Sequence, residues 1–321
     1  MQLPHSFPSW LLNQQHRGII RMMRSKYKKY SCSAILIAAA LTARGQTPEK
    51  TFDVRFDRTF KVGQVFTVTT ADAARASQKT ETPDGQTMSA SNFRRTVLEA
   101  EVRIEKVDTK NLPVLAAITL KRLTVQSVAA GQEQRESDPK EILPAGTAIS
   151  ATYLDGVPTF SLAGAKPIPP DALAALRREF HPTQLTDDVF GTPDKKKIGD
   201  TWPVDTKAMK ADMTDPQAVD PRVFTGDVTL KAQRNVTGVN CLQFEAVLHS
   251  NTIPFLQVTP TEASITVTYA TSLPVDPALP PVTNSMKTVT HIVVEQKPLG
   301  KGIVRTTSDS EVTHEATWFA K

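Results

Sequence analysis

Apolar and polar residues alternate along most of the chain after residue 60, which is typical of β-strands with one buried face. In the clearest run, residues 98–105, aliphatic side chains at even positions alternate with charged side chains at odd positions. The alternation changes phase at residues 121–122, which predicts a β-bulge there. A polar stretch over residues 73–82 is expected to follow a first strand that ends near Thr70. The pattern predicts a mainly β protein.

Turn signals separate further strands and predict antiparallel pairing. Pro83-Asp84-Gly85 has the residues of a tight turn, and Asp155-Gly156 lies between two short alternating runs, which predicts a hairpin. Another hairpin is expected across Pro298-Leu299-Gly300. The remaining predicted strands lie at residues 116–125, 147–153, 158–162, 228–232, 242–248, 263–269, 286–296 and 303–319.

Two similar octets suggest that the protein has two related halves. Residues 61–68 and 197–204 share the order Lys, β-branched, Gly, polar, any residue, aromatic, any residue, Val. Gly63 and Gly199 relax the backbone at the start of a strand, and Phe66 and Trp202 are expected to anchor it in the core. Coincidence between two strand starts is the alternative. The octets predict an N-terminal half, residues 46–196, and a C-terminal half, residues 197–321, packed as one body.

One helix is expected near residues 170–181. Pro170 and Asp171 suit its first turn, and His181-Pro182 ends it. Leu173, Leu176 and Phe180 fall on one apolar stripe. A single helical turn is also expected near residues 187–190.

The lengths of these elements predict a curled sheet. Several strands have about ten to thirteen residues, or roughly 35–40 Å, whereas a helix of about ten residues is only ~15 Å long. One short helix cannot cover the apolar face of such a sheet. The fold class we predict is therefore mainly β, a long-stranded curled antiparallel sheet, as a half-barrel, a barrel or two packed sheets, with one short lid helix.

Residues 1–45 have the pattern of a secretory signal peptide. They contain seven basic residues and no acidic residue, and a basic run precedes the apolar run at residues 33–41. Ala43 and Gly45 place small residues at the positions that favour cleavage before Gln46. Because the basic run lies far from Met1, Met22 and Met23 are alternative start sites. We expect export to the periplasm or beyond, with no membrane span in the mature chain.

Removal of the leader reverses the sign of the net charge. The whole chain has 38 basic and 33 acidic residues, and seven of the basic ones lie in residues 1–45, so the mature chain carries 31 against 33, or −2. The run Lys195–Lys197 is interpreted as a solvated strand start, and no nucleic-acid partner is expected. Of the two cysteines only Cys241 remains, which excludes an internal disulfide and favours a buried thiol.

Catalytic and metal-binding motifs are not found in the sequence. The mature histidines show neither His-x-His nor His-x-x-x-His spacing, and there is no Cys-x-x-Cys, Gly-x-Ser-x-Gly or phosphate-binding loop. We therefore expect no catalytic residue, metal or cofactor. His314 is expected to be half-buried with a backbone partner. A hydrolase site would have to be assembled from scattered residues such as Asp200, Glu245 and His249.

In outline the chain resembles bacterial exported β-rich families of unknown function. The likeness depends on the leader, the Asp155-Gly156 hairpin, the single helix and Gly199-Asp200-Thr201-Trp202. The architecture of those families is similar to the half-barrels of lipoprotein-localisation factors, which shelter acyl chains. The resemblance implies a curled sheet that could bind a hydrophobic molecule.

Three functional hypotheses follow. The first is a non-enzymatic envelope protein that binds a hydrophobic ligand or a protein partner, the second an assembly component that offers strand edges to partner proteins, and the third a hydrolase. For the first, the same side chains could equally be ordinary core. The candidate lining residues are Val102, Ile104, Leu173, Leu176, Phe180, Phe244, Ile265 and Val267.

Overall fold

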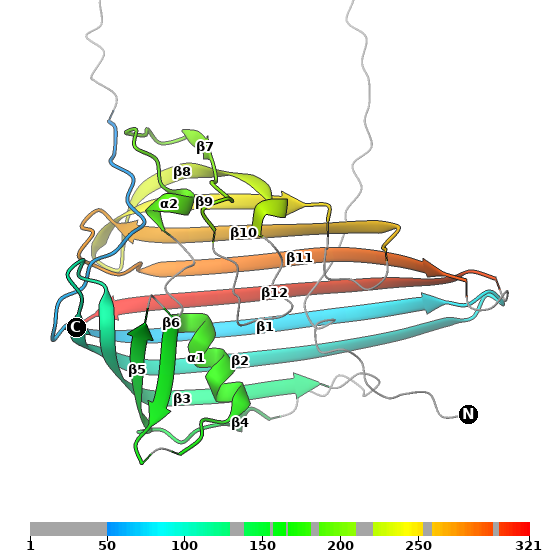
Figure 1. Cartoon of the computed structure of the whole chain (residues 1–321), viewed down its shortest axis with the longest axis horizontal. Coiled ribbons are helices and arrows are strands. Elements are labelled where there is room, and N and C mark those ends of the chain that lie inside the picture. The colour runs from blue at the N-terminus through cyan, green and yellow to red at the C-terminus, as the bar shows by residue number, and fades with distance from the viewer. Residues whose placement is uncertain are drawn as a thin grey trace, which may run out of the picture.

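The computed structural model describes residues 50–128, 138–154, 157–164, 166–180, 186–209, 221–252, 259–297 and 302–321. These residues form one 12-stranded antiparallel sheet that is not closed into a barrel, with two short α-helices, as Figure 1 shows. The predicted fold class, a mainly β curled sheet with a short helix, is confirmed. The predicted leader, the turns at residues 155–156 and 298–300 and most of the segment around 210–220 lie outside the described residues.

The strands and helices alternate little along the chain. The elements are β1 (Val65–Glu81), β2 (Thr87–Val107), β3 (Pro113–Val128), β4 (Lys140–Glu141), β5 (Ala148–Leu154), β6 (Val157–Leu162), α1 (Pro170–Phe180), α2 (Asp187–Phe190), β7 (Thr201–Pro203), the 3-10 helix η2 (Pro221–Val223), β8 (Thr225–Val236), β9 (Val239–Ser250), β10 (Glu262–Pro274), β11 (Thr283–Gln296) and β12 (Val304–Ala320).

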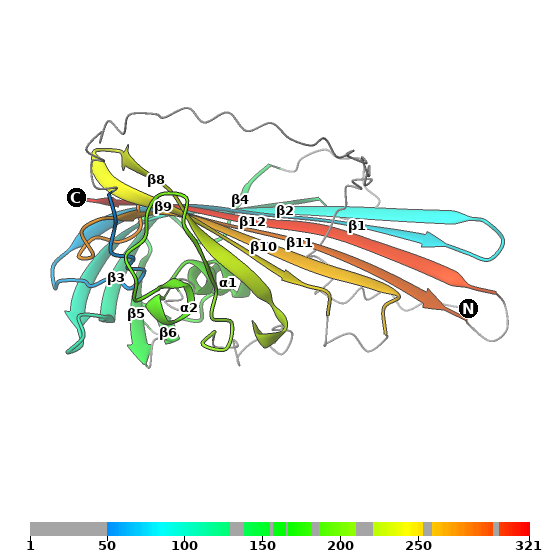
Figure 2. The same cartoon turned by 90° about the horizontal axis from the view of Figure 1, so that it is seen from above.

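The order of the strands brings the two ends of the chain together. The sheet runs β6-β5-β3-β2-β1-β12-β11-β10-β9-β8-β7, and β4 pairs with β3. Strands before α1 therefore form one side of the sheet, strands after it form the other, and the two sides meet where β1 pairs with β12. Seen from above, α1 and α2 lie on the same side of the sheet (Figure 2), which we call the helix face.

The central strands are longer than the apolar pattern predicted. The polar stretch at residues 73–82 does not follow the first strand but continues β1, which has 17 residues, and β2 begins at Thr87 rather than near Leu98. Pairing continues from Thr70 with Leu98 to Glu81 with Thr87. The prediction failed because ladder hydrogen bonds join backbone groups, so a strand can extend past its apolar segment. The bulge was predicted correctly, since Arg122 pairs with Glu99 and Leu120 with Ala100.

The two octets form the same local structure. Gly63 has φ +84° and Gly199 has φ +94°, a region that favours glycine. In the first octet the side chain of Gln64 accepts a hydrogen bond from the backbone N–H of Lys61 at 2.7 Å. In the second, Asp200 accepts from the N–H of Lys197 at 2.8 Å.

Both octets also attach to a neighbouring strand in the same way. The N–H of Gly63 donates to the carbonyl of Ile104 at 2.8 Å, and the N–H of Gly199 donates to the carbonyl of Leu230 at 2.7 Å. Ile104 and Leu230 each donate back to the residue after the glycine, at 2.9 and 3.0 Å. The strands that follow differ, because β1 has 17 residues and β7 only three.

Two apolar clusters cover the helix face at the end of the sheet where β1 starts. The N-terminal cluster joins strands β1, β2, β3 and β5 to α1 through Phe66, Leu98, Ile118 and Leu176. The C-terminal cluster joins strands β8–β11 to α2 through residues that include Phe190, Trp202 and Phe244. Phe52, Val54 and Phe56 belong to the C-terminal cluster, although they precede β1. The anchors Phe66 and Trp202 therefore lie in different clusters.

Helix α1 has the predicted bounds but a different buried face. Phe180 and Leu176 are buried as expected, whereas Leu173 is only half-buried. The buried face instead includes Ala172 and Ala175. This rotation turns Glu179 toward the sheet, because residues three apart lie on the same side of a helix. The sequence pattern missed it because small alanines allow close approach without standing out as an apolar stripe.

Candidate functional site

The register places all five predicted strand residues of the lining on the helix face. Phe66 of β1 pairs with Val102, and side chains directly opposite each other share a face. The register then continues from β1 through β12, β11 and β10 to β9. By this register Ile104, Phe244, Ile265 and Val267 lie on the same face as Val102.

The structure divides the predicted lining between the two clusters. Val102 and Ile104 lie in the N-terminal cluster with Leu176 and Phe180 of α1. Phe244 and Ile265 lie in the C-terminal cluster, and Val267 packs against it. These side chains fill the space between the sheet and its helices at this end, and their role in ligand binding stays a prediction.

Beyond the two helices, small side chains form the middle of the helix face. We call the following six residues the central floor, because each residue of β1 pairs directly with one of β12: Ala74 with Val312, Ala76 with Ser310 and Gln78 with Ser308. None of them belongs to either apolar cluster. On one side the floor is bordered by β11 and β10, where Ile265 and Ile292 continue the C-terminal cluster.

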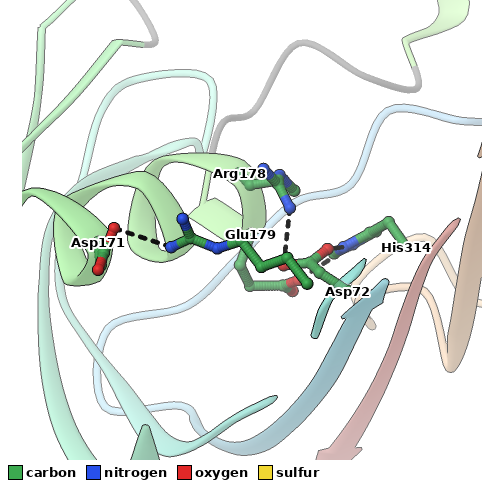
Figure 3. A network of polar contacts seen from close by, with 6 residues as sticks. Asp72, Asp171, Arg178, Glu179 and His314 are labelled. Carbon is green, nitrogen blue, oxygen red and sulfur yellow. Dashed lines mark hydrogen bonds and ion pairs between the residues drawn. The ribbon is translucent and has the colours of Figure 1, made fainter. Parts of the chain in front are cut away.

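At the end of the floor nearest α1, a buried group of charged side chains joins the helix to the sheet (Figure 3). Asp72 and His314 are a cross-strand pair of β1 and β12, and His314 Nδ1 lies 2.7 Å from Asp72 Oδ1. Helix α1 adds Glu179, whose Oε2 lies 3.3 Å from His314 Nε2, and Arg178, whose guanidinium lies 3.1 Å from Asp72 Oδ2. We call these four residues the ionic group.

Burial and mutual contact change the protonation of the ionic group. Burial by itself would lower the pKa of His314, but hydrogen bonds to Asp72 and Glu179 outweigh it and raise the pKa to about 9. Burial would raise the pKa of Asp72, yet the hydrogen bond from His314 and the charge of Arg178 lower it. Burial raises the pKa of Glu179 despite its hydrogen bonds from His314 and Trp318. At neutral pH His314 is therefore an imidazolium beside at least one carboxylate.

Two further contacts fix the position of α1. The indole N–H of Trp318 donates to Glu179 Oε1 at 2.8 Å, so both oxygens of this carboxylate contact residues of β12. At the start of the helix, Arg94 of β2 lies 2.8 Å from Asp171. The ionic group is suited to holding the lid helix in one position, because buried charges tolerate few alternative arrangements.

The sequence analysis missed two members of this group and misjudged a third. His314 was expected to have a backbone partner, but its partners are carboxylates from β1 and α1, and it is 2% exposed. Asp72 was assigned to a polar connecting stretch, and Glu179 was not considered. A usable signal was present, because Asp72 follows Val68 and Thr70 at strand parity, and Glu179 lies three residues after Leu176.

The residues considered for a hydrolase are not brought together. Asp200 accepts the hydrogen bond that closes the second octet. Glu245 pairs with Lys231 at 3.0 Å, and His249 Nδ1 lies 3.0 Å from the hydroxyl of Thr266. Each of the three therefore has its own, different partner. Cys241 is fully buried, and burial raises the pKa of its thiol, although Arg58 acts in the opposite direction.

Within the part of the chain that the structure describes, no group of three or more His, Cys, Asp or Glu residues could hold a metal ion. Over the same ranges, neither helix is long and apolar enough to cross a membrane.

Comparison with known proteins gives likeness in fold only. No protein family matches the sequence, and no curated protein matches it either. Among solved structures, a lipovitellin structure on lipid–protein interactions is similar over 81% of this chain, with 9% identity and a TM-score of 0.37. The chain spans only 25% of that protein. A DUF1329 family protein from Desulfovibrio piger is similar over 75% of this chain and 83% of its own, with 9% identity and a TM-score of 0.13.

Proposed function

We propose that this chain is an exported, non-enzymatic protein of the bacterial envelope that holds an apolar ligand on the helix face of its open sheet. The central floor is the observation that carries the proposal. Four of its six residues are Ala or Ser, and Ile265 and Ile292 border it. Small side chains beside large apolar ones suit an extended apolar chain, since binding sites for such molecules are mostly apolar and usually preformed.

Support also comes from the incomplete cover of the sheet. Figure 2 shows α1, α2, β5 and β6 gathered at one end, while β1, β2, β11 and β12 extend well past them. An apolar face that its own helices do not cover is a common position for a ligand. The ionic group fixes α1 where this cover ends.

The direct test is mass spectrometry under native conditions on protein purified from its own host. We expect a retained mass of lipid size that is released by organic solvent. If the protein carries no such mass and also binds no acyl probe added in vitro, the proposal is wrong.

Filling the floor should prevent binding. Ala76→Phe adds a large side chain to the middle of the floor, whereas Lys79→Phe adds the same side chain at an exposed position on the other face of β1. We expect the first variant to lose binding of a fluorescent acyl probe and the second to retain it. Ser308→Phe, at a half-buried position of the floor, is a second test if Ala76→Phe unfolds.

Export is part of the proposal and has its own test. The mature protein should begin at Gln46, because the preceding residues have the pattern of a cleaved leader. Mass spectrometry of the protein from its host would detect this terminus. An intact terminus upstream of Gln46 would contradict export by this route.

The open edges of the sheet favour a second candidate function, assembly with a partner protein through strand addition. Strand β7 pairs only with Asp227–Thr229 of β8. Past Leu230, no described strand pairs with the outer edge of β8. This function predicts a partner protein that co-purifies in place of a retained lipid.

A further inference from the structure

Three buried polar atoms on the helix face have no hydrogen-bond partner among the described residues. They are Oδ1 of Asn92 in β2, Oγ of Ser310 in β12 and Oγ1 of Thr290 in β11. Ser310 is 2% exposed and Thr290 is 1% exposed. Buried polar groups in native proteins nearly always have a partner, because an unpaired one has lost its contacts with water without replacement. Three such atoms in one place therefore point to a partner from outside the chain.

The register puts these atoms on one row of the sheet. Asn92 pairs with Ala76, Ala76 with Ser310, and Ser310 with Thr290. Neighbouring strands lie about 4.8 Å apart, so the row extends over roughly 14 Å. Ala76 separates Asn92 from Ser310 and has no polar side-chain atom. We call Asn92, Ser310 and Thr290 the polar row; it crosses the central floor.

The surroundings of the polar row carry no free charge. The next row away from α1 consists of Ala90, Gln78, Ser308 and Ile292. The next row toward α1 contains one charged residue, Arg94, which is paired with Asp171. An ionised head group would have no counter-ion here, and burying an unpaired charge is strongly unfavourable. The polar row thus suits an uncharged group that both donates and accepts hydrogen bonds.

We propose that the polar row binds the uncharged head of an acyl lipid that has an ester carbonyl and a free hydroxyl, as in a monoglyceride. The hydroxyls of Ser310 and Thr290 donate to the ester carbonyl oxygen. Oδ1 of Asn92 accepts from the hydroxyl of the ligand. The acyl chain lies along the central floor beside Ile292. This assignment rests on the proposed function and specifies the chemical class of its ligand.

Three probes separate the possible head groups: monooleoylglycerol, methyl oleate and sodium oleate, each titrated calorimetrically into the mature protein below its aggregation concentration. Methyl oleate keeps the ester and lacks the hydroxyl, and oleate is charged. The wild-type protein should bind monooleoylglycerol about tenfold more tightly than oleate, as expected for an uncharged site.

Two variants test the assigned contacts. Ser310→Ala combined with Thr290→Val should weaken binding of both esters by about tenfold, since each lost hydrogen bond costs roughly three- to tenfold. Asn92→Leu should weaken monooleoylglycerol about threefold to tenfold and leave methyl oleate unchanged, because only the glyceride has a hydroxyl to donate. Ser308→Ala, one row farther from α1, is the matched control and should leave all three affinities unchanged.

The same variants report on folding. Removing hydroxyls that have no partner should leave the urea midpoint of the double variant unchanged or raise it, since nothing in the protein loses a hydrogen bond. Should the double variant unfold, the single changes Ser310→Ala and Thr290→Val provide the test.

The outcomes distinguish the two proposals. A wild-type protein that binds none of the three probes contradicts the proposed function itself. Binding that is equal in the wild type, the double variant and Asn92→Leu overturns the polar row but leaves ligand binding in place. Tighter binding of oleate than of monooleoylglycerol also overturns it, because the site would then prefer a charged head.

Discussion

The two helices of this protein are attached to the same face of one sheet by different interactions. Helix α1 contacts the sheet through apolar residues and the buried ionic group of Asp72, Arg178, Glu179 and His314. Helix α2 is a single turn, and among the described residues its buried contacts are aromatic and aliphatic. The comparison separates two ways of fixing a lid, one specific in geometry and sensitive to pH, the other neither.

Aromatic packing dominates the attachment of α2. The ring of Phe56 lies 4.9 Å from Phe244 and 5.9 Å from Phe190, which is fully buried. The indole N–H of Trp202 donates to the carbonyl of Phe190 at 2.8 Å. Asp187, at the start of α2, accepts a hydrogen bond from the N–H of Phe56 at 2.5 Å. The second octet thus fixes α2 through its aromatic anchor.

The attachment of α1 gives position rather than simple stability. A buried ion pair gains little over apolar packing of the same volume, but loss of one partner leaves a buried charge unpaired. Four polar contacts from one turn of helix therefore fix α1 at one place along β1 and β12. If the floor beside it holds a ligand, a lid in one fixed position keeps that floor the same shape.

The largest effect is expected where aromatic packing is removed. Trp202→Ala should lower the free energy of unfolding by about 3–5 kcal/mol, as large core truncations do, because Trp202 is buried against Phe244 and Phe190. Urea denaturation measures this loss. Trp202→Phe keeps the packing and removes only the indole N–H, so its loss should be about 1 kcal/mol. A midpoint of Trp202→Ala near that of the wild type would place the side chain outside the core.

The ionic group should be the next most sensitive. Glu179→Gln removes one charge that faces His314 and leaves an amide oxygen for Trp318. At neutral pH the free energy of unfolding should fall by about 1.5–3 kcal/mol, the usual range for hydrogen bonds to charged groups. Glu245→Gln, in the exposed pair with Lys231, is the control and should change it by less than about 1 kcal/mol. Equal effects of the two changes would contradict the role given to Glu179.

The pH dependence of unfolding should come from the side of the sheet that carries α1. Because the pKa of His314 is raised from 6.5 to about 9 in the folded protein, its stabilisation is complete below 6.5 and is lost as the pH rises through about 9. The lowered pKa of Asp72 adds stability above its ordinary value of 3.8 that is lost in acid. The raised pKa of Glu179 acts against Asp72 there, so the alkaline change is the clearer one.

Urea midpoints between pH 6 and pH 10 measure the alkaline change. In Glu179→Gln, His314 keeps only Asp72 as a partner, so the fall should begin at lower pH. His249→Gln, at an exposed histidine, should leave the profile unchanged. A flat profile in the wild type would mean that His314 is not charged in the folded protein.

The smallest effects test whether the two octets are equivalent. Gly63→Ala and Gly199→Ala should each cost about 1–2 kcal/mol, because both glycines have positive φ and an added Cβ meets no described atom within 4 Å at either position. The cost is then one of backbone conformation alone and should be equal within error. A clear difference would show that the matching hydrogen bonds do not make the two strand starts equivalent in energy.

The sequence by itself determined the local elements of this protein. Alternation with a period of two marks a strand, and it identified most strands, the bulge at residues 121–122 and the bounds of α1 within a residue. The two octets also indicated matching strand starts, since glycine at positive φ and an aromatic three residues later are local requirements. These features depend on neighbours along the chain, so the chain alone carries them.

Only the tertiary structure decided how far the central strands extend and what meets across them. Asp72 and His314 lie 242 positions apart and become neighbours because β1 pairs with β12 in one register. The same register aligns Asn92, Ser310 and Thr290, which come from three strands. The face that α1 buries likewise depends on what it packs against, which is why Glu179 was missed. Pairing between distant strands is fixed by the burial of whole faces, and no local pattern contains that information.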